Sequence, residues 1–246
     1  MHAPLRVHVS PFGGDNPDRI IKPAKKEKVD RLYLFTMSDR DRYAPQFKVL
    51  CQQIIDQNVV DPKELRIRKC NFFDFSELMT LNASIIREEQ LANNLIYYNV
   101  STGGAFLSIT SILSCFLFKA TPYYCVMHYD PDFVPDDPEI IYFPKYTIPY
   151  PSKDLIQFLA KINNITRLRQ SKALSKAECL EILESLQPGK KFNERTSSKY
   201  NILKYGYLDN RQLENLISVE KNPRGKVRLT SEGEFAVQLF SSFFGI

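Results

Sequence analysis

Residues 95–118 read LIYYNVSTGGAFLSITSILSCFLF and place a strand, a glycine loop and a helix in direct succession. The segment Leu95–Val100 is rich in β-branched and aromatic residues, which is typical of a buried strand. The loop Ser101–Gly104 then leads into Ala105–Phe118, an apolar run that carries four hydroxyl residues and stops at Lys119. A membrane-spanning helix needs about 20 apolar residues, so we interpret this run as a buried helix of a folded domain.

The same alternation of strands and helices extends along the first 150 residues. Apolar residues recur at helical spacing between runs of β-forming residues, and this order predicts βαβ units and a mainly parallel, Rossmann-like sheet. Glu139–Pro149 is a further strand, which its prolines place at an edge of the sheet or at the end of the domain. The other expected strands are Leu5–Ser10, Arg31–Thr36, Glu64–Arg68 and Tyr123–His128, and expected helices are Phe47–Gln57 and Phe75–Leu95.

The stretch Ile148–Ser152, IPYPS, marks a domain boundary, because two prolines in three residues disfavour both a helix and a central strand. We therefore expect a Rossmann-like ligand-sensing domain over residues 1–150 and a winged helix-turn-helix domain over residues 151–246. The alternative for the second domain is a small helical packing domain with an ordinary charged surface, and winged helices can also bind proteins. Its expected elements are helices Lys153–Leu168 and Ser175–Leu186, a third helical region Lys199–Leu216 that Gly206 can break, strands Ile217–Glu220 and Val227–Thr230, and helix Ser231–Phe244.

Two helix starts of the second domain carry capping residues. Ser175 and Glu178 fit a capping box, in which the side chain of each residue accepts a hydrogen bond from the backbone N–H of the other. Either Thr230 or Ser231 is expected to cap the last helix in the same way. Signals of this kind are local, so they predict where these helices begin.

Charge is divided unevenly between the two domains. The formal net charge is +5, yet residues 1–152 hold 17 Lys and Arg against 18 Asp and Glu, so the positive excess lies in the last 94 residues. Such asymmetry indicates that the second domain meets a polyanion, and we expect double-stranded DNA. The turn 222–225, NPRG, would carry a short basic hairpin that is shaped to lie along phosphates. The candidate DNA-binding residues are Arg195, Lys199, Lys204, Arg211, Arg224, Lys226 and Arg228.

Two glycine-containing loops follow strands of the first domain. In a parallel sheet the ligand crevice lies outside the carboxyl ends of the strands, where Ser10–Asn16 (SPFGGDN) and Ser101–Gly104 are expected. Glycines let backbone N–H groups approach a ligand, and a helix N-terminus favours an anionic group such as phosphate. Neither loop is a Walker A or GxGxxG sequence, so ATP or NAD has little support, and a simple tight turn is the alternative. The candidate ligand-binding residues are Ser10, Pro11, Phe12, Gly13, Gly14, Asp15, Ser38, Ser101, Thr102, Gly103 and Gly104.

These loops and the order of elements resemble the CRISPR-associated Rossmann-fold (CARF) family, in the transcriptional-regulator branch common in archaea. The opening LRVHVSPFGGDNPDRIIKPAKKEKVDRLYLFT, the segment Asn99–Gly104 and the trailing winged helix are similar to that branch. Members of the family are dimers whose sensing domains bind cyclic oligoadenylates across the two-fold axis. The resemblance implies a homodimeric transcription regulator of CRISPR antiviral defence, with a cyclic oligoadenylate bound by Ser10–Asp15 and Thr102–Gly104. The family often follows its glycines with Thr-Lys, whereas this chain has Ala105-Phe106 and lacks that cation.

Two further classes of function remain open. One is an enzyme, either a cyclic-oligoadenylate ring nuclease or an RNA-cleaving effector, and the other is a scaffold that uses the winged helix for protein contacts. The pocket loops offer no His and no carboxylates beyond Asp15 and Asp39, whereas acid–base catalysis needs such groups within hydrogen-bond reach. The five cysteines and three histidines show no metal-ligand spacing, and the first residues, MHAPLRVHVS, lack a signal layout. We therefore expect no metal, no cofactor, no membrane association and a cytoplasmic location.

Overall fold

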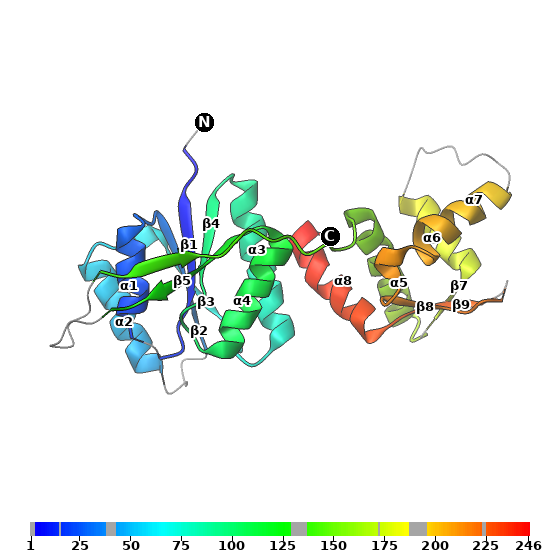
Figure 1. Ribbon diagram of the computed structural model, residues 1–246. Coiled ribbons are helices and arrows are strands. Elements are labelled where there is room, and N and C mark those ends of the chain that lie inside the picture. The colour runs from blue at the N-terminus through cyan, green and yellow to red at the C-terminus, as the bar shows by residue number, and fades with distance from the viewer. Residues whose placement is uncertain are drawn as a thin grey trace. The chain divides into compact units, whose positions relative to one another are not determined.

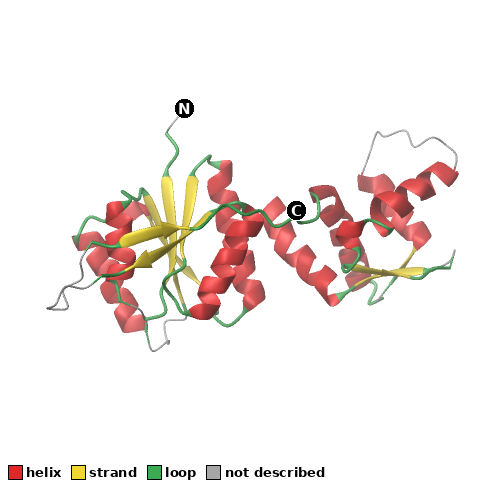
Figure 2. Cartoon of the chain, viewed as in Figure 1, coloured by secondary structure: helices red, strands yellow, loops and turns green. Residues whose placement is uncertain are grey.

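The computed structural model describes residues 3–14, 16–37, 43–128, 137–171, 173–186, 196–222 and 225–246. The chain divides into two compact units, Met1–Ile148 and Pro149–Ile246. The first unit layers helices on both faces of a sheet, and the second consists mainly of helices beside a small sheet (Figures 1 and 2). Among the described helices, none is long and apolar enough to cross a lipid bilayer.

The first unit is built around a six-stranded sheet with the strand order β3-β2-β1-β4-β5-β6. Neighbouring strands run parallel, except that β5 and β6 pair antiparallel. The prediction of a mainly parallel α/β sheet is therefore confirmed. Helices α1 and α2 lie on one face of the sheet, and α3 and α4 lie on the other (Figure 1). The elements are β1 Arg6–Pro11, α1 Asp18–Lys26, β2 Arg31–Thr36, α2 Ala44–Asp56, β3 Leu65–Lys69, α3 Phe75–Leu91, β4 Leu95–Asn99, α4 Ala105–Phe118, β5 Thr121–Val126 and β6 Glu139–Tyr142.

The central strands β1 and β2 are buried because helices cover both faces of the sheet. Val7, Val9, Leu32 and Leu34 have no exposed surface. In β1 the polar residues His8 and Ser10 alternate with Val7 and Val9 but are buried as well, so both faces of this strand are covered. The hydrophobic core therefore lies on both sides of the sheet, between the strands and the two helix layers.

At the amino ends of the strands, a buried carboxylate holds α3 to β2. Glu89 has no exposed surface and accepts hydrogen bonds from Arg31 Nη1 at 2.8 and 2.9 Å. Tyr33 Oη and Asn94 Nδ2 each donate a further bond to it at 2.6 Å. Burial by itself would raise the pKa of Glu89, but these hydrogen bonds and the charge of Arg31 outweigh it and lower the pKa below its ordinary value. Glu89 is thus held as a carboxylate beside the charged Arg31, at the end of the strands opposite the glycine loops.

Helix α4 has the predicted bounds, Ala105–Phe118, but it is not buried on all sides within the first unit. Its hydroxyl residues Thr110 and Ser114 face inward and are buried, whereas Phe106 and Ile109 are 41% and 56% exposed. The inward hydroxyls are satisfied by the helix itself; Ser114 Oγ, for example, donates to the carbonyl oxygen of Thr110 at 2.7 Å. Small hydroxyl residues can therefore pack inward, and the helix predicted to be buried has one buried face and one apolar face that is partly exposed.

The second unit combines helices with a three-stranded sheet of order β7-β9-β8, in which both pairings are antiparallel. Its third helical region ends earlier than predicted, because α7 stops at Leu203 and a π-helical turn, Lys204–Leu208, follows. Gly206 lies in that turn, and glycine disfavours a regular helix interior. The short strand β7 was not predicted. The elements are α5 Lys153–Leu168, β7 Leu174–Ser175, α6 Lys176–Leu186, α7 Thr196–Leu203, β8 Ile217–Val219, β9 Lys226–Leu229 and α8 Ser231–Phe244.

Both predicted helix caps are present. The Ser175 backbone N–H donates to Glu178 Oε2 at 2.7 Å, and the Glu178 N–H donates to Ser175 Oγ at 3.3 Å. Thr230, rather than Ser231, caps α8, since the Gly233 N–H donates to Thr230 Oγ1 at 3.0 Å. These local patterns correctly predicted the start of each helix.

Candidate ligand-binding site and nucleic-acid surface

The two predicted glycine loops touch at the carboxyl edge of the sheet. Strands β1 and β4 are parallel neighbours, so the loops that follow them leave the sheet at the same edge. A Cβ atom added to Gly13 would lie 3.0 Å from Gly103 Cα and 3.2 Å from its carbonyl oxygen. Gly103 itself has a φ of +81°, and an added Cβ there would lie 2.9 Å from Pro11 Cβ. The loops therefore pack backbone against backbone, which only glycines at these positions permit.

The glycine that begins α4 faces open space. Gly104 is the N-cap residue, with φ of +84° and ψ of 171°, and an added Cβ would meet no atom within 4 Å. No side chain caps this helix, and its first turn carries no acidic residue. The first N–H groups of a helix have no partners within the helix and carry the positive end of its dipole. The start of α4 therefore offers uncapped N–H groups, an arrangement that favours an anion, and the anion site at this loop stays a prediction.

Several of the predicted ligand-binding residues of the two loops are buried beneath the exposed glycines. Ser10, Phe12, Ser101 and Thr102 are all buried, whereas Gly14 and Gly104 are exposed. Thr102 Oγ1 has no hydrogen-bond partner among the described residues. The loop cluster, which we define as residues 10–14 and 101–104, thus presents mainly backbone to solvent. Of the other candidates, Asp15 and Ser38 lie outside the described residues, as does Asp39.

Two residues that sequence reasoning did not assign to the site hold the loop cluster together. Asn99 Oδ1 accepts hydrogen bonds from Ser101 N at 3.1 Å and Ser101 Oγ at 2.5 Å. Asn99 Nδ2 donates to the main-chain oxygen of Arg19 at 2.8 Å. Arg19 Nη1 in turn donates to the Ser101 carbonyl oxygen at 3.1 Å. The start of α1 is therefore tied to the loop that leads into α4, and it brings a guanidinium group to that loop.

His8 lies on β1, two residues before the loop cluster, but it is fully buried. Its Nδ1 lies 3.0 Å from Tyr123 Oη. Burial, and to a smaller extent the positive charge of Arg6, lower the pKa of His8 to about 3. A neutral, enclosed imidazole serves the core and does not act as an acid or base on a ligand at the surface. The part of the chain that the structure describes also holds no group of three or more residues suited to bind a metal.

The candidate DNA-binding residues differ in their surroundings. Lys199 Nζ forms an ion pair with Glu184 Oε1 at 2.7 Å, and Arg228 Nη2 lies 3.5 Å from Glu220 Oε1. Lys204 Nζ lies 4.9 Å from the centre of the Tyr205 ring. Arg211 and Lys226 are exposed, and Arg195 and Arg224 lie outside the described residues.

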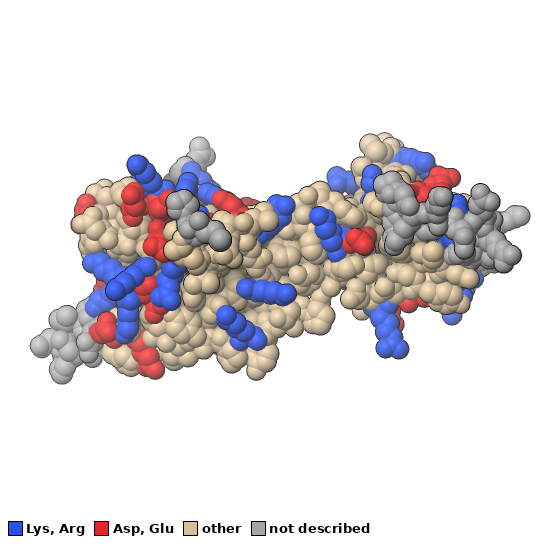
Figure 3. All heavy atoms as spheres, turned by 90° about the horizontal axis from the view of Figure 1, so that it is seen from above, with Lys and Arg blue, Asp and Glu red and all other residues tan. Residues whose placement is uncertain are grey.

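A groove of the second unit brings the candidate Lys204 together with two lysines, Lys176 and Lys221, that were not candidates. It has a volume of about 380 Å³ and lies between the start of α6, the end of α7 with the π-helical turn after it, and the end of β8. Lys176, Lys204 and Lys221 line it together with Asp209 and Glu220. Basic side chains are not confined to this unit, since Figure 3 shows Lys and Arg gathered on the first unit as well, with acidic residues among them.

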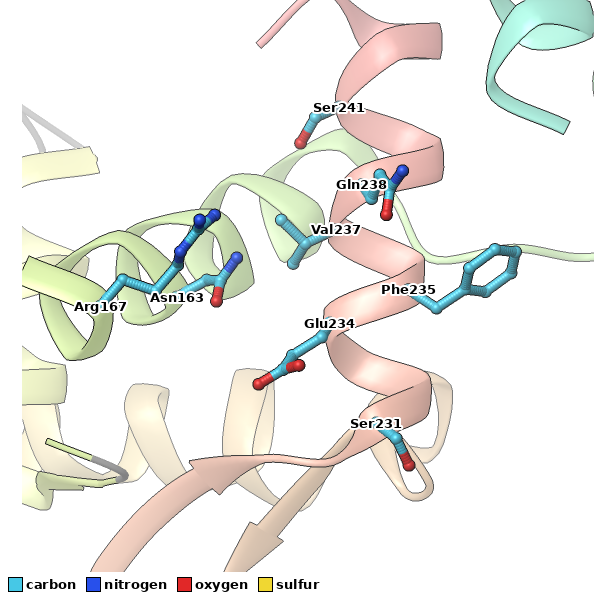
Figure 4. A pocket seen from close by; sticks show the side chains of 8 residues that line it. All are labelled: Asn163, Arg167, Ser231, Glu234, Phe235, Val237, Gln238 and Ser241. Carbon is cyan, nitrogen blue, oxygen red and sulfur yellow. The ribbon is translucent and has the colours of Figure 1, made fainter. Parts of the chain in front are cut away.

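A second groove, of about 690 Å³, lies between α5 and α8 (Figure 4). Side chains from both helices point into it, including Arg167 and Asn163 from α5 and Glu234 and Gln238 from α8. Opposite charges and amides share the lining, so no single class of ligand is indicated. Sequence reasoning did not predict this groove.

The chain is similar to several solved structures at low sequence identity. Csm6 from Enterococcus italicus, bound to cyclic hexa-2'-fluoro-hexa-dAMP, is 13% identical with a TM-score of 0.41, over 81% of this chain and 52% of that one. VC1899 from Vibrio cholerae is 11% identical with a TM-score of 0.40, over 97% and 65%. Can2 from Sulfobacillus thermosulfidooxidans, in complex with cyclic tetra-adenylate, is 11% identical with a TM-score of 0.40, over 97% and 64%.

This chain spans less than two thirds of each of those structures, and likenesses this distant assign no function. A comparison with the curated proteins finds no match. The family model described as "HFX_2341_N:-like, N-terminal" matches residues 6–128, which contain all of β1 to β5 and the loop cluster. Because this match covers half of the chain, the protein belongs to that family.

Proposed function

We propose that this protein is a ligand-responsive, DNA-binding transcription regulator whose first unit senses a cyclic oligoadenylate. On this proposal the first unit is a CARF-type sensing domain and the second is a winged helix-turn-helix. The place in CRISPR defence and the archaeal regulator branch follow from the resemblance in the loops and belong to the same proposal.

The observation that carries the sensing role is the contact between the two glycine loops, where a Cβ on Gly13 would lie 3.0 Å from Gly103 Cα. This contact creates one continuous backbone surface at the starts of α1 and α4. Helix starts and glycine backbone both favour anionic oxygen atoms, since they offer N–H groups without a side chain in the way. A phosphodiester ring, which carries a negative charge at every linkage, suits such a surface.

The DNA-binding role is supported by the order of elements in the second unit. A helix, a short strand, two helices, a hairpin and a closing helix follow one another from α5 to α8. The hairpin strand β9 carries Lys226 and Arg228, and Lys221 lies on the turn between β8 and β9. Basic side chains on a hairpin beside a helix suit contacts with phosphates, which supply sequence-independent affinity.

A homodimer is supported by the open apolar face of α4. Phe106 and Ile109 are exposed there, and Phe106 packs against the ring of Phe75 from α3 at 6.4 Å between centroids. This face starts at the loop cluster, because α4 begins directly after Gly104. A second copy seated on it by two-fold symmetry would bury the apolar side chains and bring two loop clusters near one another. A two-fold symmetric ring is the ligand that such a pair would bind.

The test is native mass spectrometry of the full chain with cyclic tetra-adenylate and cyclic hexa-adenylate, with linear oligoadenylate as the matched control. We expect a dimer that binds one ring and returns it intact, together with duplex DNA binding that weakens with salt in fluorescence anisotropy. Linear products from the ring would instead support the ring nuclease. A monomer that binds neither ring would refute the sensing role, and absence of duplex binding at low salt would refute the DNA-binding role.

A further inference from the structure

The first turn of α4 carries no cation. Ala105, Phe106 and Leu107 are all apolar, and Leu107 is buried. A helix start and glycine backbone contribute partial charges only, whereas each phosphodiester of a nucleotide ring carries a full negative charge. A full positive charge near the loop cluster would therefore add substantially to binding.

Arg19 brings such a charge to the loop cluster from a different helix. It lies in the first turn of α1, and its Nη1 donates to the Ser101 carbonyl oxygen at 3.1 Å. Its own main-chain oxygen accepts from Asn99 Nδ2 at 2.8 Å. Both its side chain and its backbone are thus fixed to the segment that leads into α4. A guanidinium held in this way has lost much of its rotamer freedom before any ligand arrives.

The charge of Arg19 is not neutralised by the described residues. None of their ion pairs includes it, and the bond to Ser101 uses one of the five N–H donors of a guanidinium. Arg19 is partly exposed, so a ligand can reach its side chain. Two lysines of the same helix point elsewhere, since Lys25 Nζ bonds to Gln57 Oε1 at 2.9 Å and Lys26 Nζ pairs with Asp137 at 2.7 Å.

We propose that Arg19 is the phosphate-binding cation of the loop cluster and supplies the positive charge that the first turn of α4 lacks. This inference rests on the proposed sensing function and adds to it the residue that selects an anionic ligand. The guanidinium fork donates two parallel hydrogen bonds to a phosphate, while the N–H bound to Ser101 holds its orientation. Ligand affinity therefore depends on salt and on the planar shape of the guanidinium.

The experiment measures binding of cyclic tetra-adenylate and cyclic hexa-adenylate to the full chain by calorimetry, at about 50 mM and about 300 mM salt. Arg19→Gln removes the charge and, because its side chain is shorter, the hydrogen bond to the Ser101 carbonyl, and we expect a loss of affinity of about 10- to 100-fold. Its affinity should also depend less on salt than that of the wild type. Arg19→Lys keeps the charge without the fork and should recover part of the loss. Lys25→Gln, the matched control, removes a charge from the same helix and should bind within about twofold of the wild type.

The outcomes separate this inference from the function on which it rests. If the wild type binds a ring and Arg19→Gln binds it equally well with the same salt dependence, the inference is wrong and the sensing function stands. If Arg19→Lys is as weak as Arg19→Gln while circular dichroism shows both to be folded, charge is not the role of Arg19, and the inference is again wrong. If the wild type binds neither ring, both fail together.

Discussion

Replacement of Gly103 by alanine tests the packing of the two glycine loops directly. The added Cβ would lie 2.6 Å from Leu107 Cδ1 and 2.9 Å from Pro11 Cβ, both closer than real Cβ contacts. The end of the Leu107 side chain can move, but Pro11, the last residue of β1, has a rigid ring that cannot. The backbone must also hold a φ of +81° with a Cβ present, which costs about 1–2 kcal/mol. Overpacking adds about 1–3 kcal/mol, so the expected loss of unfolding free energy is roughly 2–5 kcal/mol.

Gly104→Ala is the matched control for this prediction. Gly104 has φ of +84° and ψ of 171°, a conformation that essentially only glycine adopts, but its added Cβ would meet no atom within 4 Å, so its replacement has a backbone cost without overpacking. The measurement is urea unfolding followed by far-ultraviolet circular dichroism, because the chain contains no tryptophan for fluorescence. Gly104→Ala should show the backbone cost alone, whereas Gly103→Ala should show the backbone cost and the overpacking cost of about 1–3 kcal/mol. A Gly103→Ala variant as stable as the wild type would refute the described contact between the loops.

Four other changes have defined outcomes. Glu89→Gln leaves buried donors without a charged acceptor and should reduce the free energy of unfolding by about 3–5 kcal/mol in urea melts, whereas Glu88→Gln, on the exposed side of α3, should cost less than about 0.5 kcal/mol. The pKa of His8 is about 3 in the folded protein and about 6.5 in the unfolded chain, so the unfolded chain takes up a proton first as the pH falls. The contribution of His8 to the free energy of unfolding should be fully present above pH 6.5 and should fall by on the order of 4 kcal/mol toward pH 3. His8→Gln should flatten that dependence when unfolding is measured at a series of pH values. Ile109→Glu places a charge on the open face of α4 and should shift light scattering from dimer to monomer, and an unchanged dimer mass would exclude this face as the interface. Lys226→Ala should weaken binding to all duplexes alike and reduce the log–log salt slope by about one, while a change confined to one sequence would mean that Lys226 reads a base.

The parts of the fold that depend on local patterns were predictable from the sequence. Helix α4 begins and ends as predicted because a glycine pair precedes it and an apolar run fills it. The capping box at Ser175 and the cap at Thr230 are likewise local arrangements of side chain and backbone. The two loops could be expected to lie together because the carboxyl ends of parallel strands lie at the same end of a sheet.

Helix α1 shows why other parts could not be predicted. The segment DRIIKPAKK has a proline in its interior, which argues against a regular helix. Ile20, Ile21 and Ala24 are nevertheless buried in the core beside the sheet. Burial against the sheet therefore outweighs the weak helix preference of the segment, and the segment's own sequence does not show that it packs on a sheet.

The same distinction separates the glycines of the site from its cation. Glycines mark the loops in the sequence because their backbone conformations are local properties, whereas a lysine or arginine acquires a role only through its partners. Lys199 was a candidate for phosphate binding, yet the fold pairs it with Glu184. Arg19 was not a candidate, yet the fold joins it to Ser101, 82 residues away along the chain. Which of the 33 basic residues can meet a phosphate is therefore decided by contacts between distant segments, and those exist only once the sheet has brought α1 beside the start of α4.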